Sequence, residues 1–465
     1  MSRHRCQETQ AQRTGERKVR MITRIEIDGF KSFDSFSIDL SPFTAIVGPN
    51  ASGKSNLFDA IQLLSQLSDK DVRSAISGLR GEPEELFRTT RNGQREKITI
   101  AVELLLPESG VDPFGTEFTV KAQRLRYKVC LSIRKNEFGN IIGIFIDSEQ
   151  CLRIKKSEDK SVFAARFSKK IGYGGNVGDF LVTEGDKNET RFRIRQDGPN
   201  KSGKPRIIPA REASQSALST VASAEFPHLY AVKHFLSNIS FLEINARNAR
   251  RESDRFQTKI MLPDASNISA VLARIKEDTS TDANPEGSLA EISQSLSRLI
   301  PSAKRVISVT SVDKKEYSFE IEMVDGVRFS SRVISDGTLR LLSLITYLHD
   351  PNRSGLLCFE EPENGVHEGR IGALVEALRE ATEYPPDDYL QIIINTHSPA
   401  VMKSLKDSEI VAADIVTQIV NGASEKVTRM RRQPSPQTSM LDQGPDQTLT
   451  RFEIDRLLCS GADAA

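Results

Sequence analysis

The sequence lacks most features that would place the protein outside a cytoplasmic setting. None of its five cysteines forms a CxxC pair, which argues against both a disulfide framework and a zinc site. No apolar run approaches the about 20 residues that a membrane-spanning helix needs, and the first twenty residues contain no apolar signal-peptide core. The net charge is only +1, so electrostatics neither demands nor excludes a nucleic-acid partner. We therefore expect a cytoplasmic protein without a membrane partner.

The composition itself is typical of a folded globular chain. Hydrophobic residues make up 38% and charged residues 27% of the 465 positions, and this length could supply the cores of two or three domains. Residues 1–20 are polar and rich in arginine, which predicts a disordered tail. The strand-like ITRIEI follows Met21 directly, so both Met1 and Met21 are candidate starts.

A glycine-rich loop between a strand and a helix is the strongest local signal. Residues 43–47 predict a short buried strand, and apolar residues recur at helical spacing from Leu57 onward. Between them, GPNASGKS fits G-x-x-x-x-G-K-[ST], whose backbone N–H groups close around a polyphosphate. Lys54 would neutralise the β- and γ-phosphates, and Ser55 would offer its hydroxyl to Mg²⁺. The predicted nucleotide-binding residues of this loop are Gly48, Pro49, Asn50, Ala51, Ser52, Gly53, Lys54, Ser55 and Asn56.

A second apolar strand ends in adjacent acids. Residues 356–365 read LLCFEEPENG, and a buried strand that ends in carboxylates needs a cation nearby. Glu360 is expected to hold Mg²⁺, in part through water, whereas Glu361 would orient and deprotonate the attacking water. The alternative is a pair of solvated loop acids, which the apolar strand and the phosphate-binding loop disfavour.

Two further stretches suggest groups that meet the γ-phosphate. In VISDGTLRLLSLITYL, Ser335 and Gly337 form a turn before a long apolar helix, and such a turn offers a hydroxyl and free N–H groups to an anion. Taken alone, this turn is equally well explained as a helix cap. QIIINTHSP at 391–399 predicts a buried strand that ends beside His397. Its place after the paired acids favours a phosphate sensor over a structural histidine.

The order of these motifs resembles that of the ABC-type ATPases of the SMC, RecF and OLD group. The order is the phosphate-binding loop, Ser-Asp-Gly-Thr, the apolar strand with EEPEN, and THSP. The sequence is most similar to the stand-alone AAA_21-type ATPases, and GFKSF at 29–33 resembles the opening strand of these heads. The resemblance covers residues 21 to about 105 and 305 to 432. It implies an α/β fold, a P-loop NTPase head of ABC type with a mixed sheet flanked by helices.

The resemblance also implies roles for individual residues. Ser335 and Gly337 would touch the γ-phosphate of ATP held by a partner chain, His397 would be the switch histidine, and residues 364–367 would lie in the D-loop at the dimer interface. Gln215 is the candidate for the Q-loop. The sequence departs from transporter ATPases in having Glu360 where they have Asp, and Ser-Asp-Gly where they have Ser-Gly-Gly. Neither departure breaks the expected chemistry.

The middle of the chain predicts an insertion between the two halves of the head. Short alternating segments up to residue 200 predict an antiparallel β-lobe. Helical patches follow, but no heptad pattern persists, which predicts a short helical arm rather than a long coiled coil. The expected divisions are the tail 1–20, the N-terminal half of the head 21–105, the β-lobe 106–200, the helical arm 201–305, the C-terminal half 306–432, and a linker with a short terminal helix 433–465.

The sequence thus predicts an ATPase that uses ATP and Mg²⁺, with Lys54, Glu361 and His397 as catalytic residues. We expect a homodimer that closes around ATP and controls a separate effector, such as a nuclease, or engages DNA, in phage defence or DNA repair. We expect no fused TOPRIM nuclease after His397, and the arginine clusters at 247–255 and 426–432 leave DNA contact open. The alternatives are a nucleotide-gated scaffold with little turnover and an ATPase subunit of a transporter.

Overall fold

The computed structural model describes most of the chain between residues 19 and 432. Left out within this range are residues 92, 139–140, 168–170, 176–177, 186–188, 199–203, 312, 314, 354, 384–389 and 421–422. After 432, only positions 452, 453 and 456 are described. Apart from residues 19–20 and those three positions, the predicted tail, linker and terminal helix therefore lie outside the described residues. No helix within the described residues is long and apolar enough to span a membrane.

The centre of the fold is a sheet of parallel strands closed by one antiparallel strand. Its order is β14-β19-β20-β3-β21-β22, and only β22 runs antiparallel to its neighbour. Every residue of β3 and β20 is buried, as expected for strands covered on both faces. Because parallel strands end at the same edge, β3, β19 and β20 bring their following loops together. The bounds are β14 Ser240–Leu242, β19 Leu356–Glu360, β20 Gln391–Thr396, β3 Phe43–Val47, β21 Ile410–Val420 and β22 Ala423–Arg432.

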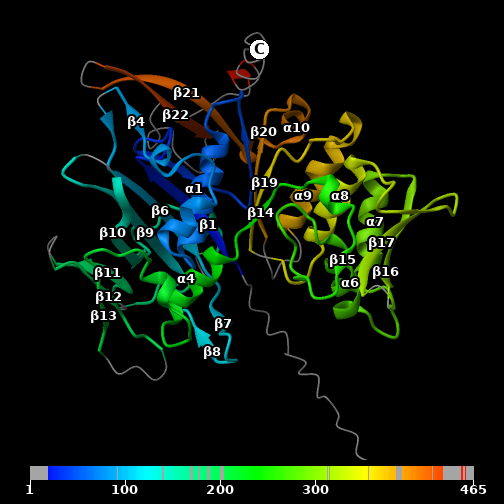
Figure 1. The fold of residues 1–465 in the computed structure, drawn as a ribbon, viewed down its shortest axis with the longest axis horizontal. Coiled ribbons are helices and arrows are strands. Elements are labelled where there is room, and N and C mark those ends of the chain that lie inside the picture. Colours follow the sequence, from blue (N-terminus) through cyan, green and yellow to red (C-terminus); the bar gives the residue numbers. More distant parts are fainter. Residues whose placement is uncertain are drawn as a thin grey trace, which may run out of the picture.

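A larger antiparallel sheet lies on one side of this centre (Figure 1). Its order is β13-β12-β11-β10-β9-β6-β1-β2, and β6 pairs with β9 along its whole length. One sheet therefore runs across the division expected between residues 105 and 106, because the β-rich segment extends the sheet that the N-terminal strands begin. The bounds are β1 Met21–Asp28, β2 Phe36–Asp39, β6 Lys97–Leu105, β9 Arg124–Lys135, β10 Ile141–Arg153, β11 Leu181–Glu184, β12 Arg191–Ile194 and β13 Arg206–Pro209.

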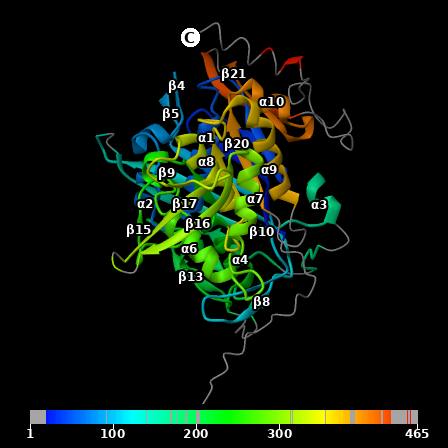
Figure 2. The same cartoon turned by 90° about the vertical axis from the view of Figure 1, so that its right-hand side faces the viewer.

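The other side of the molecule is a helical lobe with a small sheet (Figures 1 and 2). Helices α6 and α7 share one hydrophobic core with α8, α9 and the small sheet, so residues 268–299 pack into the lobe and do not project as an arm. The small sheet pairs β17 with β16, β15 and β18. The bounds are α5 Ala246–Ala249, α6 Ile268–Thr279, α7 Leu289–Leu299, α8 Asp336–Leu348, α9 Ile371–Glu383, α10 Pro399–Ser404, β15 Ser253–Asp254, β16 Ala303–Ser311, β17 Glu316–Met323 and β18 Arg328–Ser330.

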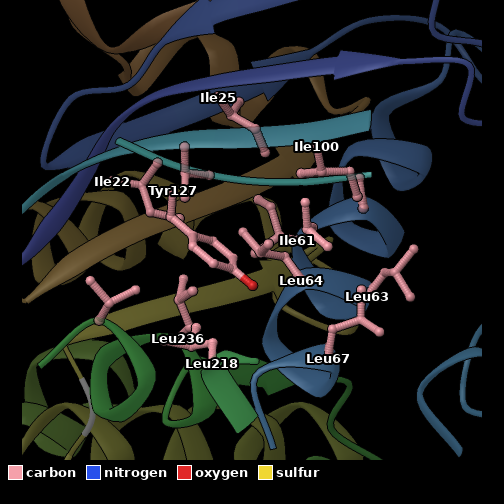
Figure 3. Close-up of a cluster of buried hydrophobic side chains, with 14 of the residues drawn as sticks. Ile22, Ile25, Ile61, Leu63, Leu64, Leu67, Ile100, Tyr127, Leu218 and Leu236 are labelled. Atoms are coloured by element: carbon pink, nitrogen blue, oxygen red, sulfur yellow. The ribbon is translucent and has the colours of Figure 1, made fainter. Parts of the chain in front are cut away.

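Helix α1 packs between the antiparallel sheet and α4. Figure 3 shows Ile61 and Leu64 of α1 beside Ile25, Ile100 and other side chains of this core. This packing fixes the axis of α1 and therefore the direction of the loop that precedes it. The remaining elements are α1 Lys54–Leu67, α2 Val72–Ser77, α3 Val162–Phe167, α4 Pro227–Ser237, β4 Thr89–Thr90, β5 Gly93–Gln94, β7 Ser109–Val111 and β8 Glu117–Thr119, with 3₁₀ turns at Pro83–Leu86, Leu218–Thr220, Glu368–Arg370 and Asp407–Glu409.

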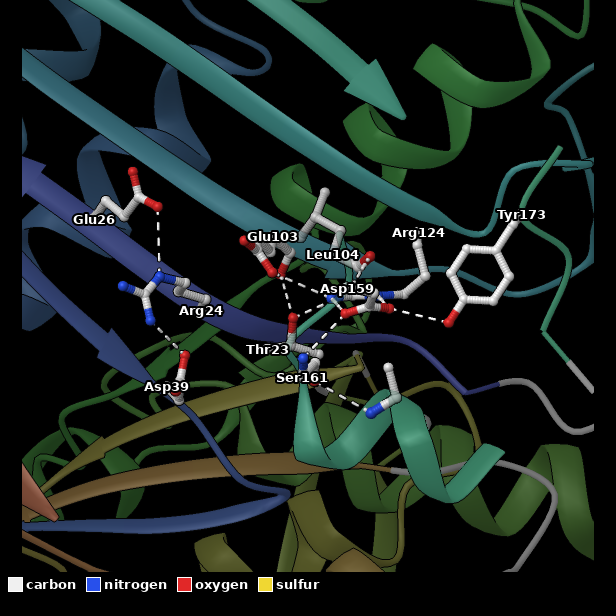
Figure 4. A network of polar contacts seen from close by, with 11 residues as sticks. Thr23, Arg24, Glu26, Asp39, Glu103, Leu104, Arg124, Asp159, Ser161 and Tyr173 are labelled. Carbon is white, nitrogen blue, oxygen red and sulfur yellow. Dashed lines mark hydrogen bonds and ion pairs between the residues drawn. The ribbon is translucent and has the colours of Figure 1, made fainter. Parts of the chain in front are cut away.

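A buried arginine joins strands of the antiparallel sheet to the loop before α3 (Figure 4). The Arg124 side chain is fully buried and donates to both carboxylate oxygens of Asp159, at 2.8 and 2.9 Å. It also donates to the Thr23 hydroxyl at 2.9 Å and pairs with Glu103 at 3.2 Å. The partners satisfy a charge that would otherwise be costly to bury.

Leu64→Ala is expected to lower the free energy of unfolding by about 2–5 kcal/mol, because a fully buried side chain leaves a cavity between α1 and the sheet. Urea unfolding followed by circular dichroism measures the change. Gln62→Ala, on the same helix at a half-buried position, is the control and should stay within about 0.5 kcal/mol of wild type. Equal unfolding midpoints for the two variants would contradict this position of Leu64.

Candidate nucleotide-binding and catalytic site

The loop 48–53 connects β3 to α1 and leaves the start of that helix open. Gly53 precedes α1 in the left-handed conformation, with φ at 91°, and no side chain caps the helix. The first N–H groups of a helix have no partner within the helix. They remain available here to an anion that also benefits from the positive end of the helix dipole.

Two glycines of the loop have no room for a side chain. A Cβ at Gly48 would lie 2.3 Å from the carbonyl oxygen of Ala413 on β21, and a Cβ at Gly53 would lie 2.2 Å from the Thr428 hydroxyl on β22. The hairpin of β21 and β22 therefore packs directly on the loop. Thr428 also donates to the Ser32 hydroxyl at 2.7 Å, and Asn56 donates to the same hydroxyl at 2.8 Å. These contacts hold the loop from the side of the C-terminal hairpin and from GFKSF.

Lys54 is buried and folds back onto its own loop. Its ammonium donates to the carbonyl oxygens of Gly48 and Pro49, both at 2.7 Å. Burial lowers the pKa of Lys54, whereas the nearby charges of Glu361, Glu363 and Glu360 act to raise it. The lysine and the acids at the end of β19 therefore share one electrostatic environment, as the two motifs predicted.

Glu360 lies at the end of β19 and pairs with an arginine that the sequence analysis missed. Arg80 donates to the Glu360 carboxylate at 3.1 Å, to Asp59 at 3.0 Å, and to the carbonyl oxygen of Ser55 at 3.1 Å. Burial raises the pKa of Glu360, while the Arg80 guanidinium acts to lower it. Arg80 thus stands between the two residues predicted to hold Mg²⁺. Its local sequence, SGLRGEPEE, carries no motif that would have revealed this role.

Glu361 is held by three neighbours in a backbone conformation that is rare for a non-glycine residue. Its φ is 46°, and its N–H donates to both the backbone and side-chain oxygens of Asn395, at 3.1 and 3.0 Å. The Asn364 amide donates to one carboxylate oxygen at 2.7 Å, and His397 Nδ1 lies 3.1 Å from the other. Such strain persists at positions that the surroundings over-determine, which are frequently functional. Glu361 and His397, predicted as base and sensor, are in direct contact.

Glu363 is a third acid in the same turn and faces inward. It is 8% exposed, and Thr396 donates to one of its oxygens, while the other oxygen is buried without a hydrogen-bond partner. Burial raises the pKa of this carboxyl, and the Thr396 bond partly offsets the effect. No sequence motif indicated a role for Glu363. We interpret it as a support for the turn that presents Glu361.

The signature turn packs against the segment that follows the paired acids. Ser335 caps α8, with its hydroxyl accepting from Thr338 N–H at 3.3 Å. A Cβ at Gly337 would lie 2.1 Å from the carbonyl oxygen of Gly365, in the predicted D-loop. Within the described residues, neither Ser335 nor Gly337 makes a hydrogen bond or ion pair with residues 48–56. The structure therefore brings Lys54, Glu361 and His397 together, whereas Ser335 and Gly337 contact Thr338 and Gly365.

The Q-loop candidate lies far from this site. Gln215 forms a bridge with Asp71, and the adjacent Ser216 bonds the carbonyl oxygen of Leu67 at the far end of α1. The helix places that end about 20 Å from Lys54, so Gln215 does not reach a metal there. The segment that begins beside Glu360 is the one that follows β14, because β14 is the parallel neighbour of β19. Its first residue, Glu243, is close enough for its charge to influence the pKa of Glu360.

The residues present suit a nucleoside triphosphate with Mg²⁺. The open start of α1 supplies N–H donors, and the buried Ser52 hydroxyl has no hydrogen-bond partner among the described residues. Ser55 and Glu360 provide the hydroxyl and carboxylate oxygens that Mg²⁺ prefers. Lys54 would supply positive charge to the phosphates once it leaves its two carbonyl partners.

Comparison with known proteins identifies the family. The AAA_21 profile, described as AAA domain, putative AbiEii toxin, Type IV TA system, matches residues 43–403. The chain belongs to the AAA_21 family. The predicted resemblance to AAA_21-type ATPases within the SMC and RecF group is therefore confirmed, as is the P-loop α/β fold class.

Shorter similarities connect this AAA_21 protein to two curated groups. It is 51% identical over 61 residues to the chromosome partition protein Smc of Methanocaldococcus jannaschii, and 34% identical over 90 residues to the DNA replication and repair protein RecF of Acaryochloris marina. These matches cover 12% and 19% of this chain but only 5% and 24% of the relatives. A solved Smc head bound to the C-winged helix domain of ScpA aligns with 88% of this chain and 97% of that chain, at 15% identity and a TM-score of 0.47.

Gly48→Ala is expected to weaken binding of a fluorescent ATP analogue by about 10–100-fold, because the new methyl group overlaps a backbone oxygen and displaces the loop at a cost of about 1–3 kcal/mol. Fluorescence titration measures the dissociation constant. Gly372→Ala is the matched control, since its Cβ would meet only the Ser404 hydroxyl, at 3.6 Å. Unchanged binding in Gly48→Ala would show that the loop does not depend on its contact with β21.

Proposed function

We propose that this AAA_21 protein is a Mg²⁺-dependent ATPase that closes as a homodimer around ATP. The observation that carries the proposal is the position of Glu361, held between Asn364 and His397 beside the buried Lys54. A carboxylate fixed in this way can accept a proton from water that attacks a phosphate bound at the loop. The family match supports the same chemistry.

Each residue then has a separate task. Lys54 exchanges its bonds to Gly48 and Pro49 for the β- and γ-phosphates, while the N–H groups at the start of α1 hold the phosphate oxygens. Ser55 and Glu360 would hold Mg²⁺, which supplies charge neutralisation when bound. Arg80 must release Glu360 for this to happen, and Asp59 remains as its partner. His397 orients Glu361 and serves as the sensor of the γ-phosphate.

The absence of a bond between the signature turn and the described residues of its own loop supports a composite site. Ser335 is exposed and Gly337 half-buried at the start of α8, and a second copy could offer them to ATP held at Lys54. Two-fold symmetry then produces two equivalent sites, each with a loop from one chain and a signature from the other. Gly365 connects the signature turn of a chain to the turn that carries Glu361 of the same chain. Closure at one site can therefore change the position of residues at the other site.

The biological role completes the proposal. ATP-driven closure would control a separate effector, with a nuclease as the leading candidate, or engage DNA. The family description, which names a putative toxin of a toxin–antitoxin system, agrees with a role in defence against phage. DNA repair is the other setting, in line with the short similarity to RecF.

A nucleotide-gated scaffold is the second candidate, and one observation favours it. Lys54 is satisfied by its own loop, and Arg80 is bonded to Glu360. This resting arrangement must be undone before hydrolysis. A scaffold would bind ATP tightly and show no faster turnover after addition of DNA or partner, whereas an ATPase would respond.

Glu361→Gln should bind ATP and lose turnover by about 10²–10⁴-fold, because the amide keeps the shape and cannot accept the proton. A closed dimer should accumulate with ATP and Mg²⁺, which light scattering measures as a doubled mass. Glu360→Gln is the matched variant and should also weaken the dependence on Mg²⁺. Full ATPase activity in Glu361→Gln would refute the assigned base.

Mixing two inactive variants tests the composite site. Lys54→Ala removes the phosphate contact and Ser335→Arg blocks the signature turn, so each variant alone should be inactive. With free exchange, half of the dimers are mixed and each has one intact site, so about a quarter of wild-type ATPase activity should return. Exchange is checked with a tag pull-down. A mixture that exchanges subunits and stays inactive would return Ser335 to the role of a helix cap.

A further inference from the structure

The signature turn is held by the end of α5. One nitrogen of the Arg250 guanidinium donates to the carbonyl oxygen of Ile334 at 2.8 Å and pairs with the Asp336 carboxylate. The backbone of the same arginine accepts from the Ser331 hydroxyl at 2.8 Å. Arg250 therefore contacts the residues on both sides of Ser335. Asp336 is the position at which this sequence departs from the transporter signature.

The charge of Asp336 is tolerated in the single chain. In the proposed dimer it would be unfavourable unless a positive charge compensated it. In the free chain, the Asp336 side chain is 67% exposed and lies in the first turn of α8, where the helix dipole favours a negative charge. In the proposed dimer, Ser335 meets the γ-phosphate of the partner's ATP. The neighbouring carboxylate would then approach a polyanion as water leaves, and the repulsion between like charges would grow.

We infer that Arg250 is a positioning residue for the composite site, and that it acts by neutralising Asp336 and fixing the turn that carries Ser335. The inference rests on the proposed function, because it concerns contact with a partner's nucleotide. Arg250 does not itself touch the phosphate in this assignment. It allows an acidic signature to approach one.

The contribution of this ion pair should depend on closure. With side-chain exposures of 29% and 67%, the pair contributes little to the stability of the free chain. Its loss should therefore leave the melting temperature nearly unchanged. The same loss should raise the ATP concentration needed for dimerisation, because closure then places an unpaired carboxylate beside the triphosphate. A purely structural arginine would show the opposite pattern.

The test uses the full chain with the Glu361→Gln background, in which closure is read without turnover. Arg250→Ala in that background should raise the ATP concentration for half-maximal dimer by at least about tenfold, as measured by light scattering. Adding Asp336→Asn should recover most of the loss, because the neutral amide has no charge to compensate. Arg251→Ala, an exposed neighbour on the same segment, is the control for general loss of positive charge. In the active enzyme, Arg250→Ala should raise KM for ATP more than it lowers kcat.

Three results on dimerisation would overturn the inference, and so would one result on stability. These are equal dimerisation with and without Arg250→Ala, failure of Asp336→Asn to restore it, and an equal defect in Arg251→Ala. A large fall in melting temperature for Arg250→Ala would assign the residue a structural role and would also overturn it. If the Glu361→Gln parent itself stays monomeric with ATP, the proposed ATP-driven dimer fails first. The two failures are therefore distinguishable.

Discussion

Three glutamates, Glu360, Glu361 and Glu363, lie within four positions at the end of β19. The arrangement of the site follows from the need to compensate their negative charge. Each acid has its own partner. Arg80 pairs with Glu360, Asn364 and His397 contact Glu361, and Thr396 donates to Glu363. Lys54 lies in the field of all three. Under the proposed function, bound Mg²⁺ would take over part of this compensation, so nucleotide binding and rearrangement of these contacts are the same event.

The elements that supply these partners are distant in sequence and adjacent in the sheet. β3, β19 and β20 are parallel neighbours and end at one edge. The phosphate-binding loop is then supported from outside the sheet by Ala413 and Thr428 of the C-terminal hairpin. The loop has little freedom to change shape alone. Movements that accompany nucleotide binding are therefore expected in side chains such as Lys54 and Arg80 rather than in the backbone of the loop.

Local sequence motifs predicted the residues at the centre of the site. They did not predict the residues that only the pairing of strands and the packing of helices bring there. The strand before Gly48, the strand before Glu360 and the strand before His397 are all present where apolar runs indicated them. Gln215 lies at the far end of α1 from Lys54, whereas β14 is the strand beside β19, and no sequence pattern shows that pairing. Arg80 was missed for the same reason: its partners, Asp59 and Glu360, are chosen by folding. The predicted division after residue 105 separates β6 from β9, whereas the two strands pair in one sheet.

The hydroxyl contact between Ser32 and Thr428 joins residues separated by 396 positions. During translation, the glycine-rich loop is made well before the strand that supports it. Between these two points, a nascent chain carries the complete loop sequence without that support. Nucleotide would stabilise only chains whose C-terminal hairpin has docked, because a ligand favours the state that binds it. Nucleotide binding would thus distinguish a chain whose hairpin has docked from one whose hairpin has not.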